Sequence, residues 1–172
     1  TATDLDFGVY SNAITVTNNL GALDASLTTD FSGGATKGTV NYTGGAGVDI
    51  VTGSPLNDII TTGAGNDTVT STGGVNTITT GDGVDIVNMG SGVDIISTGA
   101  GNDTIDASAS DLLNNDVVDG GDGDDTLTYA AATIADESLF GGLTNVEVIK
   151  PLGSADAAMA LTMNGNIGPK II

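Results

Sequence analysis

The sequence predicts an all-β protein, a parallel β-solenoid in which each coil of eighteen residues adds one short strand to each of two sheets. Three observations support this prediction. A nine-residue unit repeats without a gap over residues 44–106, an Asx and an aliphatic residue recur at fixed positions of that unit, and the flanks alternate apolar and polar residues. We expect β-rich caps before and after the solenoid.

Residues 1–43 are predicted to form the N-terminal cap. Apolar and polar residues alternate there in three short segments, at Leu5, Phe7 and Val9, at Ile14 and Val16, and at Val40 and Tyr42. Such alternation is typical of β-strands. Because the end of a solenoid exposes an unpaired strand edge, a segment that covers this edge is what the array needs.

The predicted solenoid covers residues 44–128. Seven contiguous units end at residue 106, a four-residue insert follows at 107–110, and two further units occupy 111–119 and 120–128. The sixth position is Asx in all nine units: Asp49, Asp58, Asp67, Asn76, Asp85, Asp94, Asp103, Asp116 and Asp125. The eighth position is aliphatic in all nine: Val51, Ile60, Val69, Ile78, Val87, Ile96, Ile105, Val118 and Leu127.

Each unit combines a turn with a short strand. The glycine-rich segment before the Asx favours a turn, because glycine adopts positive φ without steric cost. The β-branched residues around the eighth position favour a strand that turns one side chain inward. Two units return the chain above its start, so odd-numbered units stack on one side and even-numbered units on the other.

The composition excludes several classes of function. The net charge is −19, and the chain has three lysines but no arginine, histidine or cysteine. A polyanion without arginine does not bind nucleic acid by neutralising phosphates. The chain also lacks a thiol nucleophile, an imidazole base and the ligands of structural zinc. No apolar run is long enough to insert into a membrane. Thr1 is not a start methionine and no signal peptide is visible, so we expect a fragment or a processed chain.

The charge distribution points to bound cations. Residues 38–149 contain no positive side chain, whereas fourteen of the 22 acidic residues lie between Asp49 and Asp125. Stacked coils bring these carboxylates and the turn carbonyls together as a cage of oxygen atoms, which suits Ca²⁺ better than Mg²⁺. We therefore expect metal binding and folding to be one event. The alternatives are a solvated surface of a salt-adapted protein and a metal-free solenoid with Asx as a turn residue.

The units over residues 44–128 resemble the GGxGxDxUx repeats of RTX proteins. The resemblance implies a right-handed parallel β-roll in which sixth-position carboxylates and loop carbonyls hold Ca²⁺ between successive loops on one side. The second- and fourth-position glycines that match are Gly45, Gly47, Gly63, Gly65, Gly81, Gly83, Gly99, Gly101, Gly121 and Gly123 in odd units, and Gly90 and Gly92 in the sixth unit.

The other even units depart from this pattern. The second has Ser54 and Leu56 in place of glycines, the fourth has Thr72 and Asn76, and the eighth has Leu112 and Asn114. We expect about five to seven Ca²⁺ ions, with tighter binding on the odd side. Mutation of Asp67 or Asp85 should then cost more affinity than mutation of Asp58 or Asp94.

Residues 129–172 are predicted to form the C-terminal cap. We expect a short helix at 133–140, a strand at 145–150 and an alternating segment around residues 159–163. The segment GLTNVEVI resembles one that follows RTX repeats in bacterial surface-layer proteins. The aromatic residues are expected to pack in the two caps: Phe7, Phe31, Tyr42, Tyr129 and Phe140.

The seventh position is predicted to face outward and alternates between isoleucine and threonine. One sheet carries Ile50, Thr68, Ile86 and Thr104, and the other carries Ile59, Thr77 and Ile95. Scattered β-branched residues are ordinary in strands. The isoleucines are also suited to dock a neighbouring domain or subunit. An ice-binding face is disfavoured, because no rank of threonines is unbroken.

The resemblance implies a non-catalytic structural module that is secreted, by type I secretion in that family, to the bacterial cell surface. Calcium ions are its expected partners, together with other copies or neighbouring domains. A surface layer is the first interpretation, and the stalk of an adhesin is the alternative. A third is the RTX portion of a secreted protease or lipase, whose catalytic domain would lie elsewhere, because this chain has neither histidine nor a Gly-x-Ser-x-Gly motif.

Overall fold

The computed structural model describes residues 14–17, 27–30, 39–107, 115–130 and 140–152. These residues form a β-solenoid of parallel strands without an α-helix, which confirms the predicted fold class. None of them belongs to a helix long and apolar enough to cross a membrane. The helix expected at 133–140, apart from Phe140, lies outside the described residues, as do Phe7, Phe31 and the segment at 159–163.

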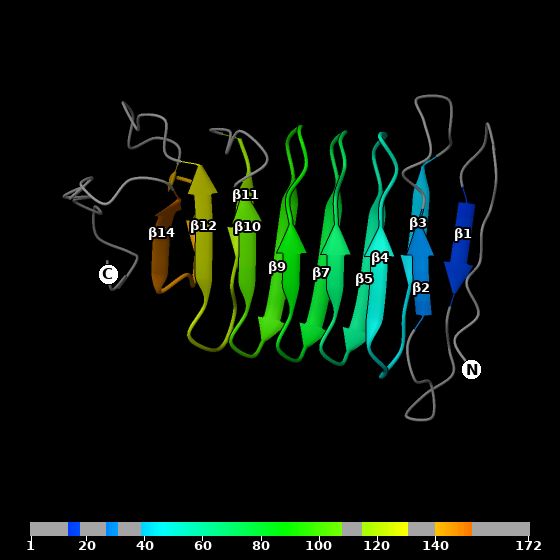
Figure 1. Cartoon of the computed structure of the whole chain (residues 1–172), viewed down its shortest axis with the longest axis horizontal. Coiled ribbons are helices and arrows are strands. Elements are labelled where there is room, and N and C mark those ends of the chain that lie inside the picture. The colour runs from blue at the N-terminus through cyan, green and yellow to red at the C-terminus, as the bar shows by residue number, and fades with distance from the viewer. Residues whose placement is uncertain (1–13, 18–26, 31–38, 108–114, 131–139, 153–172) are drawn as a thin grey trace.

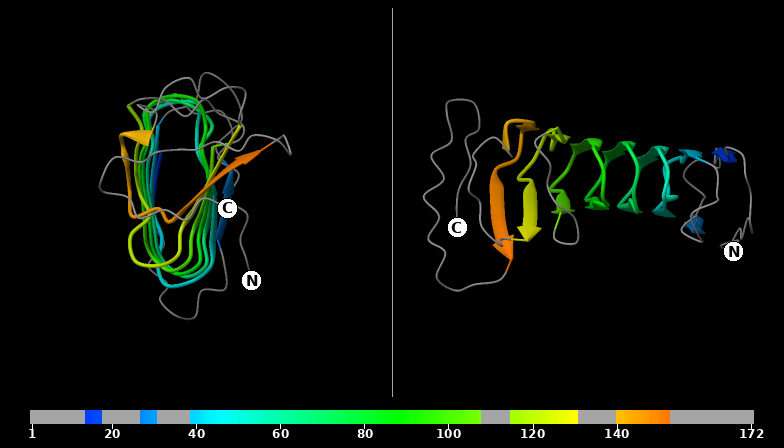
Figure 2. Two further views of the ribbon diagram at one scale, coloured as in Figure 1. Left: turned by 90° about the vertical axis from the view of Figure 1, so that its left-hand side faces the viewer. Right: turned by 90° about the horizontal axis from the view of Figure 1, so that it is seen from above.

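Two seven-stranded parallel sheets form the long walls of the solenoid (Figure 1; Figure 2, left). The first sheet contains, in spatial order, β1 (Ile14–Thr17), β3 (Val40–Thr43), β5 (Ile59–Ala64), β7 (Thr77–Asp82), β9 (Ile95–Ala100), β11 (Val117–Asp119) and β13 (Leu143–Thr144). The second contains β2 (Leu27–Asp30), β4 (Asp49–Thr52), β6 (Thr68–Thr70), β8 (Ile86–Asn88), β10 (Thr104–Ala107), β12 (Thr126–Ala130) and β14 (Val148–Leu152).

The chain alternates between the sheets, so each coil lies directly on the one before it (Figure 2, right). Within the uninterrupted block the register offset is eighteen residues; Ile60 of β5, for example, pairs with Ile78 of β7. The offset becomes 22 residues between β10 and β12, where the insert adds its four residues. Ala107, counted with the insert in the sequence, ends β10 and is buried.

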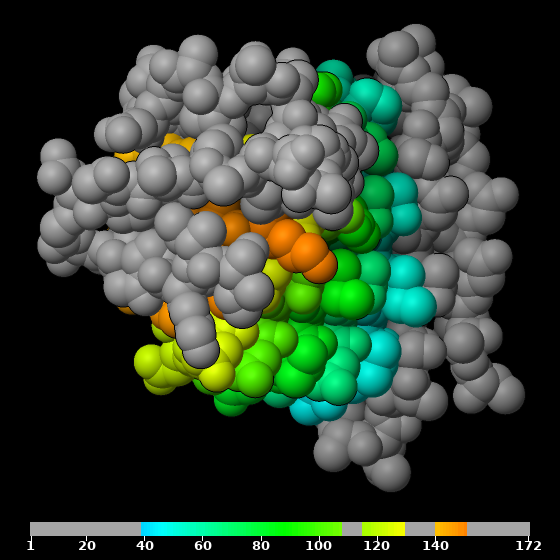
Figure 3. Space-filling model, turned by 60° about the vertical axis from the view of Figure 1, so that its left-hand side comes forward, coloured from blue at the N-terminus to red at the C-terminus, as the bar shows by residue number. Residues whose placement is uncertain are grey.

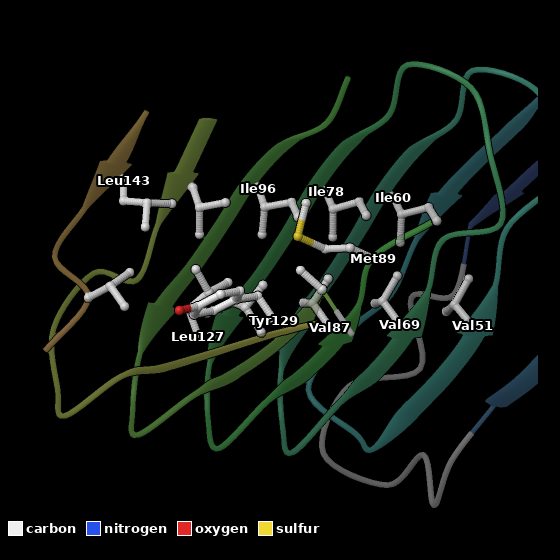
Figure 4. Close-up of a cluster of buried hydrophobic side chains, with 14 of the residues drawn as sticks. Val51, Ile60, Val69, Ile78, Val87, Met89, Ile96, Leu127, Tyr129 and Leu143 are labelled. Atoms are coloured by element: carbon white, nitrogen blue, oxygen red, sulfur yellow. The ribbon is translucent and has the colours of Figure 1, made fainter. Parts of the chain in front are cut away.

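The core is a double row of aliphatic side chains. All nine eighth-position residues are at most 1% exposed. Figure 4 shows one row from the first sheet, which includes Ile60, Ile78 and Ile96, facing a second row that includes Val51, Val69 and Val87. Because parallel strands pair in register, residues of the same kind stack at the strand spacing of about 4.8 Å. Each strand of the repeat block thus contributes one aliphatic eighth-position side chain to a thin interior.

The outer faces of the two sheets carry the seventh-position residues, as expected. Ile59 and Ile95 are about half exposed on the first sheet, and Ile50 and Ile86 are exposed on the second. Figure 3 shows the coils of the repeat block as parallel bands, coloured from cyan to yellow.

Strands from both flanks extend the two sheets in the same parallel register. β3 pairs with β1 and β5 before the block, and β12 pairs with β14 after it. Tyr129 packs edge-on against Phe140, with ring centroids 5.6 Å apart, and both are buried. The strand expected at 145–150 begins only at Val148, because Asn145, at a φ of 50°, forms a turn before it.

We expect Ile78→Ala to destabilise the calcium-loaded protein by about 2–5 kcal/mol, since it leaves a cavity in the aliphatic row. Ile59→Ala, a change of the same size on the exposed face, should cost less than about 1 kcal/mol. Denaturant unfolding followed by circular dichroism measures both. Equal losses would contradict the assignment of inner and outer faces.

Candidate metal centre

The sixth-position residues form two ladders along the two edges of the solenoid, where the turns lie. Turns of odd units form the odd edge, at the bottom of Figure 1, and turns of even units form the even edge, at the top. All nine side chains are buried: Asp49, Asp67, Asp85, Asp103 and Asp125 on the odd edge, and Asp58, Asn76, Asp94 and Asp116 on the even edge. The sequence placed them at the turns, and the structure adds that they are almost fully withdrawn from solvent.

One oxygen of each ladder side chain from Asp58 to Asp125 accepts a backbone N–H of the coil before it. On the odd edge, Oδ1 of Asp85 accepts the N–H of Asp67 at 2.7 Å, and Oδ1 of Asp103 accepts the N–H of Asp85 at 2.8 Å. Asp67 and Asp125 make the same bond at 2.8 Å. A short Asx side chain is suited to reach the adjacent coil in this way, which explains why the sixth position is Asx throughout.

The second oxygen of most odd-edge carboxylates has no hydrogen-bond partner. Buried Oδ2 atoms without a partner among the described residues belong to Asp67, Asp85, Asp103 and Asp125, and on the even edge to Asp94. A buried carboxylate oxygen left without a partner is costly, and proteins pair such groups or place them on a metal ion. These oxygen atoms therefore fit a hard cation bound at the turns.

The loop backbone on the odd edge supplies further oxygen atoms. The fourth-position carbonyls of Gly47, Gly65 and Gly83 accept no hydrogen bond within the described part of the chain. The second-position carbonyl of Gly45 accepts the N–H of Ala64 at 2.8 Å, and that of Gly99 accepts the N–H of Asp122 at 2.7 Å. A carbonyl oxygen has two lone pairs, so each of these retains one for a cation.

The loops of successive coils stack so closely that only glycine fits. Gly83 has a φ of 151°, and a Cβ atom there would collide with the carbonyl oxygen of Gly65. The same collision recurs one coil later, between Gly101 and the carbonyl of Gly83. This close approach aligns the fourth-position carbonyls in a column beside the carboxylates.

Among the described residues, no three acidic side chains come close enough together to hold a metal by themselves. This agrees with the geometry, because successive carboxylates are separated by one coil and each turn contributes a single sixth-position side chain. A cation at this edge would need backbone carbonyls as most of its ligands. Six to eight oxygen ligands in a flexible arrangement are what Ca²⁺ takes.

Burial dominates the electrostatics of the ladders. Desolvation raises the pKa of Asp85, and the bond from the Asp67 N–H opposes that rise. Burial likewise raises the pKa of Asp58 and Asp94. The pKa of Asp125 rises to about 6, mainly through desolvation, with further contributions from the negative charges of Asp103 and Glu147.

Sequence reasoning missed two features of the odd edge. Glu147 continues the carboxylate ladder beyond the repeats, because its Oε2 accepts the N–H of Asp125 at 2.8 Å. The acid-x-aliphatic spacing of Glu147 and Ile149, which matches positions six and eight, is the signal that could have found it. A buried threonine ladder runs beside the carboxylates, in which Thr62, Thr80 and Thr98 each donate a hydroxyl to a carbonyl of the next coil.

The repeat block matches a known protein family. The model of the RTX calcium-binding nonapeptide repeat matches more than half of the chain, at residues 43–78, 52–87, 61–96, 89–111 and 113–131. The chain belongs to this RTX repeat family. RTX repeats bind Ca²⁺, and their β-roll is a non-catalytic structural module typical of secreted bacterial proteins. No curated protein and no solved structure matches this RTX chain.

The raised pKa values predict how the metal-free protein responds to pH. An acid with a raised pKa in the folded state binds its proton more tightly when folded, so it adds stability at low pH and loses this as the pH rises through the folded value. Chelated protein should therefore gain β-structure as the pH falls from 7 through about 6, the pKa of Asp125.

Circular dichroism of chelated protein at a series of pH values measures this effect. Asp125→Asn should weaken the pH dependence, whereas Asp122→Asn, an exposed residue of the same loop, should leave it unchanged. Metal-free protein that loses β-structure on acidification to pH 5 would contradict the prediction.

Proposed function

We propose that this RTX chain is an extracellular structural module of a bacterial surface layer that folds and assembles when its loops bind Ca²⁺. The observation that carries the proposal is the row of buried carboxylate oxygens without a partner on the odd edge. No lysine or arginine lies between residues 38 and 149 to neutralise them. The polyanion would remain unfolded where Ca²⁺ is scarce, as inside a cell, and would fold at the higher concentrations outside.

We further propose that the ions lie between successive loops of one edge. Their ligands would be the sixth-position carboxylates, including Asp67, Asp85 and Asp103, and the carbonyls of the second- and fourth-position glycines. Roughly five to seven ions would contribute about +10 to +14 and offset most of the charge of the acidic residues in the block. The partnerless Oδ2 atoms of the odd edge support tighter binding there than on the even edge, where Asp94 alone of the described residues has such an atom.

Assembly is proposed to use the outer sheet faces. Ile59, Ile95 and Val117 are each about half exposed on the first sheet, and Ile50 and Ile86 are exposed on the second. Apolar side chains repeated on both faces of a rigid slab suit contacts with neighbouring copies or with adjoining domains of the same protein. Secretion to the cell surface follows from the same proposal, since both folding and assembly require external Ca²⁺.

A calcium titration followed by circular dichroism and sedimentation tests folding and assembly together. We expect β-structure to appear on addition of Ca²⁺ and larger particles to form at the same or higher concentrations, with extended sheets visible by electron microscopy. Folding without assembly would support a calcium-dependent module but contradict the surface-layer role. It would favour an adhesin stalk or the RTX portion of a secreted enzyme. Full β-structure in chelator at pH 7 would overturn the proposal as a whole.

Substitutions test the position of the ions. Asp67→Asn or Asp85→Asn should remove a tightly bound ion and lower the average Ca²⁺ affinity by roughly tenfold or more, because each removes a charged ligand. Asp58→Asn should lower the affinity less, since Ser54 and Val40 already donate to both oxygens of this carboxylate. Isothermal titration calorimetry measures affinity and stoichiometry together, and equal losses at Asp67 and Asp58 would contradict the asymmetry.

A further inference from the structure

The loop of the fourth unit holds a hydrogen-bond donor where the odd loops hold a partnerless oxygen. Asn76 replaces the aspartate, and its Nδ2 donates to Oγ of Ser71 at 2.7 Å and to the carbonyl oxygen of Gly73 at 3.0 Å. The same Nδ2 lies 2.9 Å from Oδ1 of Asp94 in the next coil. One amide group therefore connects its own loop to the carboxylate of the following loop, which is the connection that a cation would make.

The orientation of this amide is fixed by its other end. Oδ1 of Asn76 accepts the backbone N–H of Asp58 at 2.8 Å. Since an N–H can be accepted only by the oxygen of the amide, Nδ2 must face Ser71, Gly73 and Asp94. Asn76 is 1% exposed, so no water replaces these contacts from outside.

The loop of the second unit is satisfied by a different donor. Ser54 occupies the second position, where the odd loops have glycine, and both of its donors reach Asp58. Its backbone N–H lies 2.7 Å from Oδ2 and its hydroxyl lies 2.7 Å from Oδ1. The N–H of Val40 adds a third bond to Oδ1 at 2.7 Å, so neither oxygen of this carboxylate lacks a partner.

We propose that the loops of the second and fourth units hold no cation, because the Ser54 donors and the Asn76 amide take its place. This inference rests on the proposed function and refines it. The RTX chain then has a calcium-dependent odd edge and an even edge whose first two loops are held by protein hydrogen bonds. The binding sites number about five, four between the odd loops and one beside Asp94.

The chemistry of the fourth loop explains the exclusion. A cation there would face the hydrogens of the Asn76 amide, which carry partial positive charge, and would have to displace them from Ser71 and Gly73. It would also lack one carboxylate ligand, since Asn76 contributes no charge. Asparagine and aspartate differ here only in that an NH₂ group stands in place of an oxygen. Aspartate in this position would therefore present a second oxygen, a possible cation ligand, to the same surroundings.

Asn76→Asp tests the proposal directly. The variant keeps the shape of the side chain and should bind one Ca²⁺ ion more per folded molecule than the wild type, counted by metal analysis after gel filtration in Ca²⁺. Asp67→Asn, the reverse exchange on the odd edge, should bind one ion fewer. An unchanged or lower count in folded Asn76→Asp would overturn the proposal.

Asn76→Ala gives a second and independent measurement. If the wild-type fourth loop held an ion, this variant would lose it, whereas the proposal predicts an unchanged ion count per folded molecule. A loss of one ion in Asn76→Ala would overturn the inference even if Asn76→Asp failed to fold. The proposed function fails separately, if the wild type itself binds no Ca²⁺ and Asp67→Asn changes nothing.

Discussion

The stacking of the coils depends on the hydrogen bond from a backbone N–H to the sixth-position side chain of the following coil. Because this bond uses one carboxylate oxygen and buries the other, it creates its own electrostatic problem. Asp67, Asp85 and Asp103 each hold one oxygen in this bond and one without a partner. The fold therefore couples coil stacking to a need for positive charge, which this sequence does not supply from its own side chains in the repeat block.

Because the interior is thin, this need for positive charge affects the stability of the whole molecule. Each strand of the repeat block adds one eighth-position aliphatic residue to the double row, so the apolar contribution of a coil is small. The buried sixth-position side chains stand only two residues before the aliphatic residues of this row in the sequence, as Asp58 does before Ile60. Ca²⁺ bound at the turns, as we propose, would be part of the interior, and the acidic composition would then be a structural requirement more than a device for solubility.

The sequence was sufficient for features that repeat and insufficient for those that do not. Fixed positions for Asx and aliphatic residues predicted the two sheets, the eighteen-residue coil and the core correctly. The role of Ser54 was not predictable, because it depends on how a side chain turns within its loop. The strand expected at 145–150 starts at Val148 because Asn145 turns the chain before it. Glu147 lies outside the nine-residue units, so the repeat pattern did not reveal its place in the ladder.

The offset of eighteen residues between partner strands has a consequence for how such chains change in length. Loss or gain of two whole units would leave every remaining unit on its own edge and in register, so the molecule can shorten or grow by one coil. Loss or gain of a single unit would transfer every later turn to the opposite edge. Such a change before Ser54 would place the loops of Ser54 and Asn76 on the odd edge, among the loops whose carboxylates have a partnerless oxygen. Duplication or deletion of an even number of units therefore preserves the composition of both edges, which a change by one unit does not.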